Sequence, residues 1–204
     1  MTTTENGIYT TTVGSQTVQL PLVRLNDDLT IALLICVDMG VSFSETAGRE
    51  LADLMRPYRP EIVVSVATMG IPLAIEASRA LGLDDYVILH KTPKTHLGES
   101  WAEPVYSITT DAPQRLRMDP ARVDAVRGRR VAVVDDVIST GASLSSALRL
   151  VRRMDAEPVV IGTLMTEGGE WKKALGEDAA LVRTLGAMPL FHPDGEGGLV
   201  EDWG

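Results

Sequence analysis

The sequence has only one cysteine, no excess of basic residues and no long hydrophobic run. Cys36 has no second cysteine with which to form an intrachain disulfide, and its apolar neighbours favour a role in core packing. The net charge of −9 argues against a general nucleic-acid-binding surface, so we expect no nucleic-acid partner. No apolar stretch reaches the roughly 18 residues of a membrane-spanning helix, and residues 1–7 do not resemble a signal peptide. We therefore expect a cytoplasmic protein with no membrane partner.

The sequence also lacks any Gly-Lys-Ser or Gly-Lys-Thr tripeptide. A strand that ends in acidic residues is typical of nucleoside-triphosphatases, but those proteins need such a tripeptide in their phosphate-binding loop. This absence excludes that class, although residues 131–143 contain an apolar strand that ends in two carboxylates.

Residues 131–143 read VAVVDDVISTGAS and predict a buried strand, a tight turn and the start of a helix near residue 142. The apolar residues that follow recur with a helical period up to Met154. At a helix start, backbone N–H groups lack intrahelical partners and attract anions, most plausibly a phosphate. Because two carboxylates would repel a bare phosphate, Asp135 and Asp136 indicate a ligand that also carries hydroxyl groups or Mg²⁺. A sugar phosphate meets both conditions.

This stretch closely resembles the loop that binds phosphoribosyl diphosphate (PRPP) in type I phosphoribosyltransferases. The resemblance implies that Asp135 and Asp136 hold the ribose hydroxyls and, through water, Mg²⁺. It also implies that the 5′-phosphate lies on the following turn, at Ser139, Thr140, Gly141, Ala142 and Ser143.

A second strand–turn–helix unit at residues 61–81 lies where the family has its diphosphate loop. The resemblance assigns Thr68, Met69 and Gly70 to the diphosphate, although the turn lacks the charged residue often found in relatives. Lys91, just past the strand at residues 86–89, corresponds to a basic diphosphate contact. Lys94 resembles a second lysine found in adenine phosphoribosyltransferases.

The family also implies a catalytic loop and a base-binding region. The polar residues 95–104 lie where relatives carry a loop that covers the reaction, and Glu99 would be an acid or base near the purine, with a surface role as the alternative. Glu167 occupies a position where relatives have a glutamate near the base. Trp171 could stack on a purine or could cap the core.

The predicted fold is an α/β domain with a doubly wound, mostly parallel sheet. We expect a β-rich N-terminal region at residues 1–40 that covers the base as a hood, a core at 41–193, and a disordered or loosely docked acidic tail at 194–204. Residues 8–20 predict a hairpin, 29–37 and 188–191 predict strands, and 44–55 predict a helix capped by Ser44.

The sequence thus predicts a Mg²⁺-dependent phosphoribosyltransferase in which Asp136, Lys91 and Glu99 are catalytic. PRPP and a nucleobase would be its ligands, adenine being favoured because no lysine follows residue 165 until Lys172. A homodimer is implied by the resemblance alone. Xanthine, hypoxanthine and orotate remain alternative acceptors, and a PRPP-binding regulator without turnover remains an alternative function.

Overall fold

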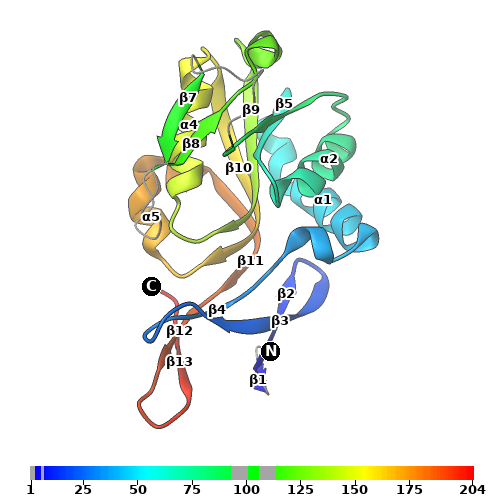
Figure 1. Cartoon of the computed structure of the whole chain (residues 1–204). Helices are drawn as coiled ribbons and strands as arrows, with labels where there is room; N and C mark the ends of the chain where they lie inside the picture. The colour runs from blue at the N-terminus through cyan, green and yellow to red at the C-terminus, as the bar shows by residue number, and fades with distance from the viewer. Residues whose placement is uncertain (1–2, 6, 93–100, 106–113) are drawn as a thin grey trace.

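The computed structural model describes residues 3–5, 7–92, 101–105 and 114–204. Its centre is a five-stranded sheet in which every neighbouring pair of strands is parallel (Figure 1). The strand order is β11-β10-β9-β5-β6, with the bounds Ile62–Val66 (β5), Tyr86–Leu89 (β6), Arg130–Ile138 (β9), Glu157–Glu167 (β10) and Val182–Met188 (β11). The predicted parallel α/β fold is confirmed.

Both faces of this sheet are buried by helices, which explains the near-continuous apolar strands. In β9, Ala132 and Val134 pack in one cluster with α1 and α2, whereas Val131 and Val133 pack in another with α4 and α5. The alternation is what successive side chains of a strand require when both faces are covered. The helices are Val41–Met55 (α1), Gly70–Leu81 (α2), Ala142–Arg153 (α4) and Glu170–Leu175 (α5).

A second, antiparallel sheet lies beyond the carboxyl ends of the core strands (Figure 1), and we call it the hood sheet. Its order is β1-β2-β3-β4-β12-β13, with the bounds Thr3–Glu5, Ile8–Val13, Gln16–Arg24, Thr30–Ala32, Leu190–Pro193 and Leu199–Asp202. The predicted hairpin at residues 8–20 is present as β2 and β3. Tyr9 and Phe191 join the two ends of the chain through an edge-to-face contact with ring centroids 5.2 Å apart.

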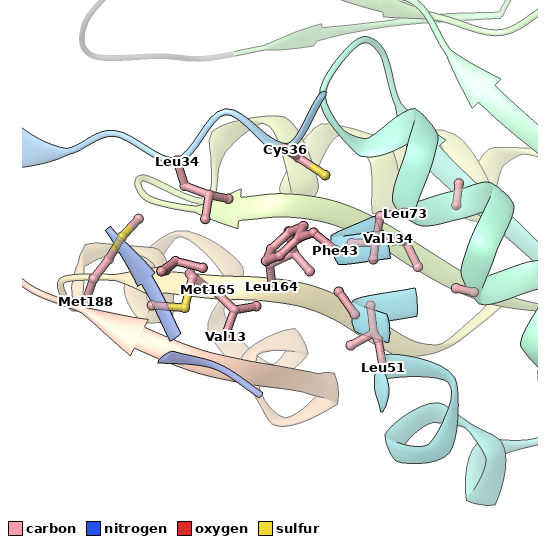
Figure 2. Close-up of a cluster of buried hydrophobic side chains, with 14 of the residues drawn as sticks. Val13, Leu34, Cys36, Phe43, Leu51, Leu73, Val134, Leu164, Met165 and Met188 are labelled. Carbon is pink, nitrogen blue, oxygen red and sulfur yellow. The ribbon is translucent and has the colours of Figure 1, made fainter. Parts of the chain in front are cut away.

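The hood sheet and the parallel sheet share one apolar core. Figure 2 shows Val13 of β2 and Leu34 in the same cluster as Leu164 of β10, Leu51 of α1 and Val134 of β9. Cys36 is also buried there, as its apolar neighbours predicted. Because these side chains are removed from water together, the position of the hood sheet on the core is fixed by packing.

The predicted cap of α1 is wrong. The helix begins at Val41, after Gly40 with φ +88°, and Ser44 lies inside it, where its hydroxyl donates to the Gly40 carbonyl at 3.1 Å. A serine within a helix can bond back to the carbonyl four residues earlier instead of capping the N-terminus.

Two predicted strands also differ from the structure. In residues 29–37, only Thr30–Ala32 form a strand, and Cys36–Asp38 form a 3₁₀ turn (η1) in which Cys36 enters the core and Val37 is exposed. The stretch 188–191 is divided between two sheets, because Met188 ends β11 and Leu190 begins β12. An apolar run reports burial, but it does not show where the chain passes from one sheet to another.

The tail was predicted to be disordered or loosely docked, and disorder is wrong for its strand. Leu199–Asp202 pair with β12 as an antiparallel strand. The turn between them is held by Asp194, whose Oδ1 accepts the backbone N–H groups of Glu196 and Gly198 at 2.8 Å each. These bonds lower the pKa of Asp194.

The remaining elements lie around the core sheet. They are β7 (Ala102–Val105) and β8 (Gln114–Arg117), which form a small antiparallel sheet beside α4, and α3 (Val123–Val126) with the 3₁₀ turns Arg56–Tyr58, Pro120–Arg122 and Gly176–Leu181. Among the described residues, no helix has the length and apolarity to cross a bilayer.

Candidate active site

The candidate site lies at the carboxyl ends of β5 and β9, the two central neighbours of the parallel sheet. From β5 the chain continues outward to β6, whereas from β9 it continues to β10 and β11 on the opposite side. Ligands of doubly wound sheets bind at such a reversal of strand order, because the loops leave the two strands in opposite directions and open a crevice.

A cavity of about 190 Å³ occupies this crevice, and we call it the phosphate cavity. It brings together three stretches that the sequence predicted separately: the turn after β5, the residue after β6 and the turn after β9. The predicted site residues in its wall are Thr68, Met69, Lys91, Asp135, Asp136, Ser139, Thr140, Gly141, Ala142 and Ser143. The peptide bond between Ala67 and Thr68, in the first of these turns, is cis.

Asp135 and Asp136 are positioned by β9, which continues past them to Ile138. The Asp135 carboxyl accepts the Asp136 backbone N–H at 3.1 Å, and Thr163 of β10 donates to the Asp136 carbonyl at 2.8 Å. Burial raises the pKa of both carboxyls, and the Asp136 charge raises that of Asp135 further. The positive charge of Lys91 lowers both pKa values and so opposes these shifts. Lys91 follows β6, is exposed and lines the same cavity as the two aspartates.

Gly70, the remaining predicted diphosphate residue, lies behind the cavity wall at the start of α2. A Cβ atom there would lie 2.3 Å from Ser65 Oγ and 3.1 Å from Asp135 Oδ1, so any larger residue would force one of them to move. The glycine therefore allows the N-terminus of α2 to approach Asp135 directly. Its structural role is to permit this close contact.

The turn at residues 139–143 is shaped by Gly141, which has φ +77° and is the N-cap residue of α4. A Cβ atom at Gly141 would lie 3.1–3.2 Å from atoms of Ala174 and Trp171, so the turn packs closely on α5. Thr140 Oγ1 accepts the Ala142 N–H at 3.4 Å. Because the glycine N-cap has no side chain to accept the N–H groups of Ser143 and Leu144, these two groups can bind an anion.

A second cavity, of about 770 Å³, lies between the parallel sheet and the hood sheet, and we call it the hood pocket. It shares Ser139 and Thr140 with the phosphate cavity, so the two cavities are neighbours. Glu167 is in its wall with an exposed fraction of only 5%. Burial raises the pKa of Glu167, and a hydrogen bond from Ser139 partly opposes the increase.

Trp171 was predicted to stack on a purine or to cap the core, and it lies in the core. It is 8% exposed, belongs to the core cluster beside α4, and donates its indole N–H to the Gly168 carbonyl at 3.2 Å. The helix α5 turns this side chain toward the core, while Glu170 and Lys173 of the same helix line the hood pocket. The structure thus assigns Trp171 to core packing.

Two further predicted residues, Lys94 and Glu99, lie outside the described part of the chain. Within the described residues, no group of three or more histidine, cysteine, aspartate or glutamate side chains gathers into a metal site. The carboxylate pair Asp135–Asp136 is therefore the described feature best suited to an oxygen-preferring cation.

Sequence reasoning missed most of the hood pocket. Its apolar wall comes from Leu25 and Leu29 on either side of the β3–β4 turn, Ile31 of β4, and Leu190 of β12. The one available signal was the placement of two leucines around the polar residues 26–28, in a turn where apolar side chains are uncommon.

The parallel sheet and the crevice at its strand reversal, lined by the turns after β5 and β9, define a doubly wound α/β protein. Residues 46–183 match the model of the phosphoribosyl transferase domain, and the chain belongs to this family. The predicted family is therefore confirmed.

Relatives within the family differ in the base that they are named for. The chain is 29% identical over 124 residues to an orotate phosphoribosyltransferase of Caldanaerobacter subterraneus, covering 61% of this chain and 54% of that protein. It is 28% identical over 131 residues to a xanthine phosphoribosyltransferase of Laribacter hongkongensis, and the match covers 64% of this chain and 68% of that protein. The crystal structure of an adenine phosphoribosyltransferase from Rhodothermus marinus has the same fold, with a TM-score of 0.63 and 20% identity over 89% of this chain and 94% of that one.

Proposed function

We propose that the protein transfers the 5-phosphoribosyl group of PRPP to a purine base, with adenine favoured, and releases diphosphate. The observation that carries this proposal is the convergence of three separate turns on the phosphate cavity, beside a hood pocket that shares two residues with it. In this reaction a ring nitrogen of the base forms a bond to ribose C1 and loses its proton. The bond from C1 to the diphosphate oxygen breaks, and diphosphate leaves with the electron pair.

Each end of PRPP has a matching part of the cavity. The turn at residues 139–143 binds the 5′-phosphate through backbone N–H and hydroxyl groups. Asp135 and Asp136 accept hydrogen bonds from the ribose 2′- and 3′-hydroxyls. Thr68, Met69 and Lys91 bind the diphosphate, and Lys91 offsets the charge that develops on it as it leaves. Catalysis is then mainly positioning and charge stabilisation.

The same carboxylates fit the Mg²⁺ that the family implies. Asp135 and Asp136 are adjacent carboxyl groups in the cavity wall, and carboxylate oxygens are ligands that Mg²⁺ prefers. We propose that they hold Mg²⁺ through water, where the ion would neutralise charge on the diphosphate. A homodimer remains a prediction from the resemblance, and a cytoplasmic location remains a prediction from the sequence.

Adenine is favoured because the described charged groups of the hood pocket are two glutamates and one lysine. Carboxylates accept hydrogen bonds from an exocyclic amino group, and a net negative wall disfavours an acceptor that carries its own carboxylate, such as orotate. Glu167 is the residue that we expect to contact the base.

The test uses the purified chain with PRPP and Mg²⁺, offered adenine, hypoxanthine, guanine, xanthine and orotate separately, with nucleotide and diphosphate measured together. We expect AMP and diphosphate in equal amounts, and a Glu167→Gln variant that retains PRPP binding but has an altered order of preference among the bases. If only another base gave a nucleotide, that base would replace adenine as the proposed acceptor. PRPP binding by calorimetry without nucleotide from any base would point to a regulator, and absence of PRPP binding would refute the function.

A further inference from the structure

The hood pocket is larger than its proposed base requires. Its volume of about 770 Å³ is about four times that of the phosphate cavity. It also falls in the range of roughly 300–1,000 Å³ that is typical of sites for drug-sized ligands, which are much larger than a bare purine. A substrate that fills this pocket would carry more than the two fused rings.

The walls of the pocket divide by chemistry. Glu167, Glu170 and Lys173 form one side, at the end of β10 and along α5. The other side is apolar and consists of four side chains from the hood sheet and its β3–β4 turn, namely Leu25, Leu29, Ile31 and Leu190. A ligand complementary to both sides has a polar edge and an apolar extension.

The apolar side is held by a hydrogen-bonded turn. The Leu25 N–H donates to the Leu29 carbonyl at 2.9 Å, and Arg24 donates to the Asn26 carbonyl at 3.0 Å and to the Asp27 carboxylate at 2.9 Å. Leu25 nevertheless leaves 54% of its surface exposed. Leu25 is an exposed leucine on an ordered turn, beside three other apolar side chains. An apolar group that covers this surface removes it from water, which lowers the free energy of the complex.

The polar side fixes the orientation of the ligand. Glu167 is buried, and Ser139 links it by a hydrogen bond to the turn that binds the 5′-phosphate. The Glu167 carboxylate can accept a hydrogen bond from an exocyclic amino group. An aminopurine offers this N–H, and a substituent on its amino nitrogen still leaves one.

We propose that the preferred acceptor is an aminopurine whose exocyclic nitrogen carries an apolar substituent. Its remaining amino N–H lies at Glu167, and the substituent covers Leu25, Leu29, Ile31 and Leu190. This inference rests on the proposed phosphoribosyl transfer and uses the same bond changes, because the substituent takes no part in the reaction.

The experiment compares kcat/KM for adenine and for N6-benzyladenine, with Mg²⁺ and PRPP, in three chains. These are the wild type, Leu25→Asp, and the control Leu54→Asp, which changes another exposed leucine on α1, outside the described wall of the pocket. We expect the wild type to use the benzylated base at least as well as adenine. Leu25→Asp should lower the ratio of benzylated base to adenine about tenfold or more, the effect typical of a lost apolar contact, and Leu54→Asp should leave the ratio unchanged.

The outcomes separate this inference from the proposed function. Use of adenine without use of the benzylated base, or an unchanged ratio in Leu25→Asp, would overturn the inference and leave the transferase function intact. If no chain made nucleotide from either base or from the other four, the transferase function itself would fail, and the inference would fail with it.

Discussion

Replacement of Gly70 by alanine tests the contact between α2 and the acidic pair. The new Cβ would lie 2.3 Å from Ser65 Oγ, which is on a fully buried residue of β5, and 3.1 Å from Asp135 Oδ1. Ser65, Asp135 or the backbone must therefore shift. Overpacking of this kind typically costs about 1–3 kcal/mol of stability. If Asp135 moves, one hydrogen bond to a charged group is lost from PRPP, which corresponds to roughly tenfold weaker binding or more.

The measurements are urea unfolding without ligand and calorimetric titration with PRPP and Mg²⁺. A Ser65→Ala change in the same chain removes the closer of the two contacts, so we expect the double variant to recover most of the lost stability. Coupling of about 1 kcal/mol or more between the two sites would show that the contact is direct.

Gly128→Ala is the matched control. This residue has φ +72°, precedes the opposite end of β9, and a Cβ atom there would meet no described atom within 4 Å. The left-handed backbone alone should cost about 1–2 kcal/mol, with no change in PRPP affinity. The reasoning would be refuted if Gly70→Ala matched the wild type in both measurements, or if Ser65→Ala failed to restore its stability.

Three further predictions concern Asp136, Asp135 and the buried Cys36. Asp136→Asn should lower turnover by about 10²–10³ without lowering the unfolding midpoint, because it removes one preorganised electrostatic contact; turnover within tenfold of the wild type would contradict this role. Asp135→Asn should raise the free energy of unfolding at pH 8 without ligand. The pKa of Asp135 is raised in the fold, so the native state binds more protons and the wild type loses stability as pH rises from the unfolded value of about 3.9 through the native one. The difference in free energy of unfolding between Asp135→Asn and the wild type, measured by denaturant titration, should therefore shrink as pH falls toward about 4. An Asp135→Asn variant less stable than the wild type at pH 8 would refute the raised pKa of Asp135. Burial and the two aspartates raise the pKa of the Cys36 thiol to about 12, so a thiol reagent at pH 8 should react only at the rate of unfolding; fast reaction in the native state would place Cys36 elsewhere.

The sequence by itself determined the features that lie within one short stretch. The strand, turn and helix at residues 131–154 are encoded by four apolar β-formers, a glycine and a helical period, all local signals, and the structure matches them closely. The parallel arrangement of the core strands also follows from the sequence, because strands that alternate with helices are typical of a parallel sheet. The phosphate cavity was thus foreseeable from its separate turns.

Only the tertiary structure decided which distant residues share a wall. Leu25 and Leu190 face the same pocket because β4 and β12 pair in the hood sheet, and no local pattern encodes that pairing. Trp171 was a candidate for the base because its type suits stacking, but the rotation of α5 buried it and presented Lys173 instead. Gly70 had been assigned to the diphosphate, and its role as a contact between α2 and Asp135 depends on atoms of β5 and β9. Propensity and periodicity act over a few residues, whereas the shape of a pocket is set by side chains that packing brings together.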